Sequence, residues 1–219
     1  MANRAEKDKA AKAEILRRVR GALEKSQITA PEVPRNYNRT GAHAPGSDSV
    51  IDVFVDALED YNASVDVVSE KDVPQAIAKA LEGDKVVVVP PGLKPDWIQA
   101  VPGDVKVDEP GSQLTHRELN EVDAVLTASR CAVSHTGTIL LDGTDDQGRR
   151  AITLVPDKHV VLVQAKEVFP TVPQAVDELG KHPQRPITWI AGPSATSDIE
   201  LVRVDGVHGP RTLHVIIVK

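Results

Sequence analysis

The chain has 219 residues, 41% of them hydrophobic, which fits one globular domain with an appendage. A formal net charge of −6 and an aromatic content of 3% count against a nucleic-acid partner, which requires a basic or stacking surface. Its single cysteine, Cys131, excludes an internal disulfide, a cysteine-ligated iron–sulfur cluster and a cysteine-type zinc site, and is expected to be a buried hydrophobic residue.

The first 47 residues are predicted to form a helix and an extended arm. Residues 4–25 carry eight basic and four acidic residues and an apolar stripe that includes Leu16, Val19 and Leu23. This pattern is typical of an amphipathic helix that docks on its own domain or on a neighbouring subunit. A charged N-terminus and no run near the roughly 18 apolar residues of a membrane span predict a cytoplasmic protein without membrane insertion.

Residues 26–47 are rich in proline, glycine and asparagine and show no periodicity, as expected of a linker or a wrapping arm. Arg35 and Tyr37 follow Pro34 on this segment and are candidates to reach over a ligand pocket. The alternative is a tether whose tyrosine packs on the surface.

Residues 48–219 are predicted to form the domain. Its first half alternates predicted helices with strands: helices near 50–61, 72–81, 95–101 and 115–120, and strands at 64–68, 85–89, 105–107 and 122–127. The strand predicted at residues 85–89 contains a continuous run of valines before Pro90, which is typical of a parallel strand buried on both faces. The alternation predicts an α/β layered fold with right-handed crossovers.

The pattern changes after Ser129. We expect a glycine turn at 143–148, a helix at 172–179, and strands at 139–142, 151–155, 160–164, 187–191 and 213–218. The hairpin-like connections require an antiparallel portion in the sheet, which is therefore predicted to be mixed. The last two strands are expected to be buried neighbours.

Three turns concentrate polar groups, at 134–138, 149–159 and 194–208, and we expect them to meet beyond the carboxyl ends of the strands. Ser197 and Glu200 fit a capping box that starts a short helix. Its first amides can form an anion-binding cup with nearby hydroxyl groups. The predicted ligand-binding residues of two turns are Thr136, Gly137, Thr138, Gly192, Ser194, Thr196 and Ser197.

Arg149 and Arg150 open the predicted strand at 151–155. An arginine there can present its planar guanidinium to a carboxylate or phosphate. Because consecutive strand residues point to opposite faces, at most one of the two is expected to serve a pocket. The alternative is a solvated hairpin end.

Histidines and acids supply the candidate catalytic groups. His135, His159 and His208 lie on separate turns that can converge, but no H-x-x-x-H or H-x-H spacing supports a metal site, and none is predicted. We expect His135 or His208 to act in acid–base chemistry or to bind a carboxylate. Asp198 and Glu200 are candidate acids, although helix capping alone explains their positions.

The motifs T-G-T-I-L-L, G-R-R-A-I-T-L-V-P-D-K-H, G-P-S-A-T-S-D-I-E and G-V-H-G-P occur in this order from residue 136 to residue 210. With them, the chain from about residue 50 resembles the LUD domain family. The resemblance implies a three-layer α/β/α Rossmann-like sandwich with a mixed sheet, similar to the sugar-phosphate isomerase and CoA-transferase group. It also implies a part in oxidising L-lactate to pyruvate, alongside partners that carry iron–sulfur clusters.

The resemblance leaves three hypotheses for function. The chain is a non-redox component of an L-lactate oxidation system that binds a small anionic ligand, a free-standing isomerase or CoA-ester enzyme, or a scaffolding subunit for iron–sulfur proteins. Proteins of this fold often have a glutamate before T-G-T that forms an acyl intermediate, whereas this chain has His135. His135 cannot form such an acyl intermediate, so this difference counts against CoA-transferase chemistry in this chain. No cofactor is assigned, and a homo-oligomer is compatible with the sequence.

Overall fold

The computed structural model describes residues 2–26, 31–196, 204–206 and 209–219. The chain divides into two units, Met1–Tyr37 and Asn38–Lys219, and each is described by itself. The proposed division at residue 47 stays a prediction.

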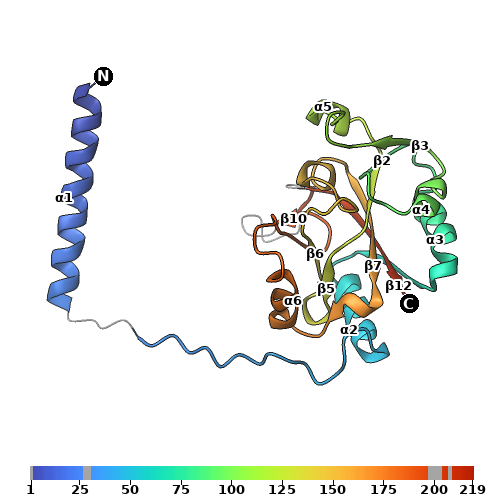
Figure 1. The fold of residues 1–219 in the computed structure, drawn as a ribbon, viewed down its shortest axis with the longest axis horizontal. Coiled ribbons are helices and arrows are strands. Elements are labelled where there is room, and N and C mark those ends of the chain that lie inside the picture. The colour runs from blue at the N-terminus through green and yellow to red at the C-terminus, as the bar shows by residue number, and fades with distance from the viewer. Residues whose placement is uncertain (1, 27–30, 197–203, 207–208) are drawn as a thin grey trace. The chain divides into compact units, whose positions relative to one another are not determined.

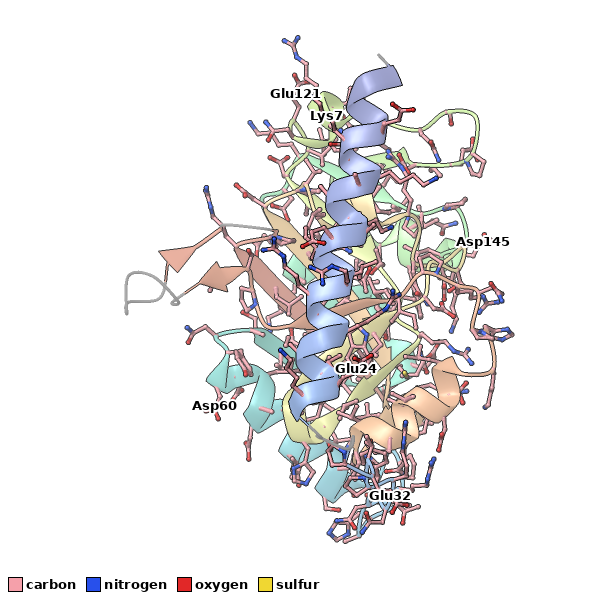
Figure 2. The ribbon with its side chains drawn as sticks, turned by 90° about the vertical axis from the view of Figure 1, so that its left-hand side faces the viewer. Lys7, Glu24, Glu32, Asp60, Glu121 and Asp145 are labelled. Carbon is pink, nitrogen blue, oxygen red and sulfur yellow. The ribbon has the colours of Figure 1, made fainter. Side chains whose placement is uncertain are left out.

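The first unit contains one long helix, α1 (Ala2–Ser26), so the helix expected over residues 4–25 is confirmed. Within it Glu14 accepts hydrogen bonds from Arg17 and Arg18 at 2.8 Å and 2.7 Å. Charged side chains such as Lys7 and Glu24 project along its length (Figure 2). The predicted docking of its apolar stripe stays a prediction.

The second unit is built on a six-stranded sheet, called sheet A, in which every pair of neighbours is parallel. Its valine-rich strands have the continuous apolar character of a sheet covered on both faces. Their order across the sheet is β1 (Ser64–Val68), β12 (Thr212–Val218), β7 (Lys158–Gln164), β4 (Ala124–Thr127), β2 (Val86–Val89) and β3 (Asp104–Val107).

Helices α3 (Val73–Ala80) and α4 (Pro95–Gln99) cover one face of sheet A (Figure 1). The 3-10 helix η1 (Glu70–Asp72) leads into α3, and Pro74 lies in the first turn of α3, where a missing N–H costs no helical bond. Ile77 and Trp97 are buried against alternate residues of the strands, among them Val87 and Leu126.

The other face of sheet A packs against helix α2 (Asp48–Asp60) and a second sheet, called sheet B. Phe54 and Leu58 of α2 are fully buried between Val161 of β7 and Ile139 of sheet B. Sheet B has the order β8 (Val168–Phe169), β5 (Cys131–Val133), β6 (Thr138–Leu141) and β9 (Thr188–Ala191).

Further helices complete this side of the domain. Helix α6 (Val172–Leu179) covers the outer face of sheet B (Figure 1), where Ala175 and Leu179 pack on Cys131. Helix α5 (His116–Leu119) begins with a capping box between Thr115 and Glu118. The remaining short elements are η2 (Ser134–Thr136), η3 (Arg150–Thr153), η4 (Ala165–Glu167) and the pair β10 (Ala195–Thr196) and β11 (Val204–Asp205).

The α/β architecture confirms the expected fold class, with two corrections of detail. The strand predicted at 151–155 is wrong: Arg150–Thr153 is the 3-10 helix η3, in which Thr153 Oγ1 donates to the Arg150 carbonyl at 3.1 Å. The predicted pairing of the last two long strands is also wrong. β9 lies in sheet B beside β6, while β12 lies in sheet A, so the antiparallel pairs β5–β6 and β6–β9 belong to a sheet separate from sheet A.

Candidate functional site

A pocket of about 250 Å³ lies in the domain where η3, strand β9 and the turns around residues 192 and 210 meet the first residues of β7 and β12. We call it the η3 pocket. Its polar lining comes from Arg150, Thr153, His159, Thr188 and Ser194, and its other lining residues are Leu154, Trp189, Ile190, Ala191, Gly192, Pro193, Ala195, Gly209, Pro210 and Leu213.

The η3 pocket lies at the amino edge of sheet A, because His159 and Leu213 are the second residues of β7 and β12. The expectation of a site beyond the carboxyl ends of the strands is therefore wrong for this pocket. The reason is connectivity. The segments 149–157 and 192–211 each lead into a parallel strand, so their described last residues lie where that strand begins.

Arg150 gives the η3 pocket its charge. It is exposed, and among the described residues its guanidinium has no hydrogen-bond or ion-pair partner. No acidic side chain is among the described residues that line the pocket. An unpaired guanidinium can hold a carboxylate or phosphate with two parallel hydrogen bonds.

Ser194 joins the two turns that close the η3 pocket. Its N–H donates to the Pro210 carbonyl at 2.8 Å, and its carbonyl accepts from the Gly206 N–H at 2.7 Å. The predicted site residues Ser194 and Gly192 thus lie at the same pocket as Arg150.

Gly192 has a positive φ of 75°, and a Cβ atom there would lie 2.6 Å from the Cβ of Tyr61. A side chain at this position would both strain the backbone and collide with the end of α2. Glycine is therefore needed for the turn itself, whatever contact it makes with a ligand.

His159 is the one histidine among the described lining residues, and it is fully buried. Its Nε2 lies 2.8 Å from Thr127 Oγ1 on β4. Burial lowers the pKa of His159 to about 4, so the imidazole is neutral at pH 7. Sequence reasoning grouped His159 with two other histidines. The stronger signal was a polar residue at the start of the otherwise apolar stretch H-V-V-L-V.

Arg149 has a different role from Arg150. Its Nε and Nη2 donate to the two carboxylate oxygens of Asp108 at 2.7 Å and 2.9 Å, and Nη2 also donates to the Leu114 carbonyl. Burial opposes ionisation of Asp108, but hydrogen bonds from Arg149 and the Leu114 N–H keep the pKa of this carboxyl below its ordinary value. Arg149 is thus held in a structural ion pair.

Arg149 also lines a second cavity of about 340 Å³, which shares Arg150, Thr153 and Thr188 with the η3 pocket. The two arginines precede and begin a 3-10 helix rather than a strand, so the argument from alternating strand faces does not apply to them.

The turn of Thr136, Gly137 and Thr138 lies beside helix α2. A Cβ atom on Gly137, whose φ is 56°, would lie 3.0 Å from the Ala57 carbonyl oxygen. The hydroxyls of Thr136 and Thr138 lie 2.8 Å apart, and Thr138 pairs with Ala191 of β9. This turn does not line the η3 pocket as described, and neither does exposed His135 on η2, so their predicted roles stay predictions.

Several predicted site residues cannot be placed at the η3 pocket. Ser197, Asp198, Glu200 and His208 lie outside the described residues, as does the helix predicted to begin at Ser197. Thr196 belongs to β10, but its side chain is not described. Arg35 and Tyr37 belong to the first unit.

Across the parts of the chain that the structure describes, no cluster of three or more His, Cys, Asp or Glu residues is arranged to hold a metal ion. Within the same residues, no helix combines the length and apolar character needed to cross a membrane. Cys131 is buried in sheet B, and burial raises the pKa of its thiol to about 12.

The LUD domain family model matches residues 51–218, which is most of the chain. The chain belongs to the LUD domain family. Lactate utilization protein C of Deinococcus radiodurans is 48% identical over 171 residues, which are 77% of this chain and 79% of that protein. Lactate utilization protein C of Bacillus subtilis is 29% identical over 43% of this chain and 41% of its own length.

A solved structure supports the same assignment. The crystal structure of a DUF162 family protein from Deinococcus radiodurans covers 78% of this chain and 97% of its own, with a TM-score of 0.69 and 42% identity. The resemblance drawn from the T-G-T, D-K-H, G-P-S and G-V-H-G-P motifs is therefore confirmed. This LUD chain shares its α/β fold with a relative of known structure.

Proposed function

We propose that this LUD protein is a non-redox component of a system that oxidises L-lactate to pyruvate, and that it binds a small anionic ligand in the η3 pocket. The observation that supports the ligand is Arg150, a cation without a partner among the described residues, at a pocket lined there by no acid.

Support for the metabolic role comes from relatives. A protein 48% identical over most of its length is named lactate utilization protein C, and so is the more distant Bacillus subtilis relative. Oxidation of lactate removes two electrons, and a chain with one buried cysteine cannot ligate an iron–sulfur cluster by itself. Electron transfer is therefore assigned in this proposal to partner proteins, which the family resemblance implies carry iron–sulfur clusters.

The metabolic role is tested by deleting the gene and measuring growth on L-lactate as sole carbon source, with glucose as the reference. We expect growth on lactate to fail and to be restored by the wild-type gene. Complementation with Arg150→Ala should not restore it, whereas Arg117→Ala should, because Arg117 is an exposed arginine paired with Glu121 and does not line the pocket. Normal growth of the deletion strain on lactate would refute the proposal.

An assembly role is the second candidate, favoured by the apolar stripe of α1. Ile15, Leu16, Val19 and Leu23 carry substantial exposed surface on this helix, which a partner helix can cover. The full chain with Leu16→Glu and Val19→Glu should then lose co-purification of iron–sulfur partners, while Arg17→Glu should retain it. Equal recovery with both variants would count against assembly through α1.

A free-standing isomerase or CoA-ester enzyme remains the alternative from fold similarity. Turnover of a sugar phosphate or an acyl-CoA by the purified chain, lost in Arg150→Ala, would replace the proposal with this one.

A further inference from the structure

His159 combines two features that do not normally occur together. Its side chain is fully buried at the η3 pocket, yet its Nδ1 atom has no hydrogen-bond partner among the described residues. Buried polar atoms are nearly always paired, because burial removes the hydrogen bonds that water would supply. An unpaired ring nitrogen on a residue that lines a pocket therefore indicates a missing partner.

The hydrogen bond to Thr127 can be made by either tautomer of this ring, and each tautomer leaves one hydrogen without a described acceptor. Thr127 is fully buried, and within the described residues its hydroxyl has one partner, His159 Nε2 at 2.8 Å. If Nε2 carried the proton, the Thr127 hydroxyl hydrogen would be buried without an acceptor. When Thr127 donates to Nε2 instead, the proton lies on Nδ1, and the hydrogen left without a described acceptor belongs to a residue that lines the pocket, where a ligand can accept it. Nδ1 is then a hydrogen-bond donor.

The charge of the described lining limits the ligand. Arg150 contributes one positive charge, His159 is neutral at pH 7, and no other described lining residue is ionisable. One positive charge matches one negative charge better than it matches a phosphate dianion or a CoA ester. A volume of about 250 Å³ is also below the roughly 300–1,000 Å³ of pockets for larger ligands.

We propose, on the basis of the proposed anion site, that the η3 pocket selects a small monocarboxylate with an oxygen on the adjacent carbon, a 2-hydroxy or 2-oxo acid. Arg150 holds the carboxylate, and His159 Nδ1–H donates to the second oxygen. A ligand with no oxygen there leaves the buried N–H unpaired, which is the basis of discrimination.

The test measures binding to the full-length protein by calorimetry, with L-lactate, pyruvate, propionate and inorganic phosphate as the probes. Propionate has the same chain length and charge as lactate but lacks the C2 oxygen. We expect lactate or pyruvate to bind at least tenfold more tightly than propionate, a difference of about 1.4 kcal/mol. Inorganic phosphate should bind more weakly than lactate or pyruvate.

Two variants of His159 distinguish the effect of its N–H donor from the effect of its side-chain volume. His159→Asn places an amide N–H near the position of Nδ1 and should retain the preference for lactate or pyruvate over propionate. His159→Leu is similar in size and apolar, and should abolish that preference while keeping weak carboxylate binding through Arg150. Where a variant does not fold, ¹⁵N NMR of the wild-type imidazole gives the tautomer directly, and an Nε2–H tautomer overturns the inference.

The outcomes distinguish this inference from the proposed function. Equal binding of lactate and propionate, lost in Arg150→Ala, overturns the role of His159 and leaves the anion pocket intact. Failure of every carboxylate to bind overturns the pocket and therefore this inference too, while the lactate growth defect tests the metabolic role separately.

Discussion

Arg149 and Arg150 are adjacent in sequence but do different work, and replacing each with alanine should separate stability from binding. Asp108, whose side chain is 1% exposed, receives two hydrogen bonds from Arg149, whose side chain is 29% exposed. In Arg149→Ala the carboxylate keeps the Leu114 N–H at 2.8 Å and loses its counter-charge. Arg150 has no described partner to lose.

The magnitude follows from the cost of a buried, uncompensated charge. Removing one partner of a buried ion pair typically costs about 3–5 kcal/mol, and partial exposure of Arg149 places the expected loss near the lower end, about 3 kcal/mol. At roughly 2–4 °C per kcal/mol for a domain of this size, the melting temperature should fall by about 6–12 °C. For Arg150→Ala the change in unfolding free energy should be within about 0.5 kcal/mol.

The assay is urea unfolding followed by far-UV circular dichroism, with lactate and pyruvate binding measured on the same samples. Arg149→Ala should lose stability and retain ligand binding while folded, and Arg150→Ala should show the reverse. Adding Asp108→Asn to Arg149→Ala should recover part of the loss, because the amide carries no charge. Equal destabilisation by the two alanine variants would refute the division of roles.

Three further predictions follow from the same geometry. Burial lowers the pKa of His159 from 6.5 to about 4, so as the pH falls the unfolded chain binds a proton before the folded chain does. The free energy of unfolding should therefore decrease between about pH 6.5 and pH 4, by up to about 1.4 kcal/mol per pH unit. In urea titrations His159→Asn should flatten this pH dependence. Gly192→Ala should lower the melting temperature of the protein more than Gly83→Ala does. Both glycines have a positive φ, but only at Gly192 would an added Cβ atom meet a neighbour, Tyr61. The Cys131 thiol, with its pKa near 12, should react with an alkylating reagent only after unfolding, as mass spectrometry of native and denatured samples would show.

A specific result would contradict each of these three predictions. An unchanged slope in His159→Asn would mean that other groups control the acid sensitivity between pH 4 and 6.5. Equal melting temperatures for the two glycine variants would show that Tyr61 moves aside at little cost. Rapid labelling of native Cys131 would indicate that sheet B opens locally.

The regular elements were predictable because hydrophobic pattern and local signals agreed. The strand at residues 64–68 and the helix at residues 172–179 have the predicted bounds, the helix with a proline in its first turn. The segment A-I-T-L-V at residues 151–155 has strand composition but forms η3, where Ile152 is buried in a satellite core with Val88 and Val125. Short apolar runs do not distinguish these states, and tertiary packing decides.

The division into two sheets was not predictable from composition, since strand pairing depends on contacts between distant segments. β9 pairs with β6, about 50 residues earlier in the chain, and no local signal selects β6 over β12 as its partner. The presence of Ser194, Gly192 and Arg150 at one pocket could be predicted, because the sequence marks the segments that carry all three as polar connections. Which edge of the sheet they occupy depended on recognising that both turns precede parallel strands.

The edge matters for how the η3 pocket can hold an anion. Helices that lead into parallel strands, as α3 leads into β2, end at the amino edge and direct the negative ends of their dipoles there. The carboxyl edge, by contrast, receives helix N-termini that favour anions. Among the described elements, no helix N-terminus of this kind serves the pocket at the amino edge, so we expect its affinity for a carboxylate to come from a side chain. Arg150 is the only ionised residue at pH 7 among those described in its lining, which is why anion binding should depend on this one guanidinium.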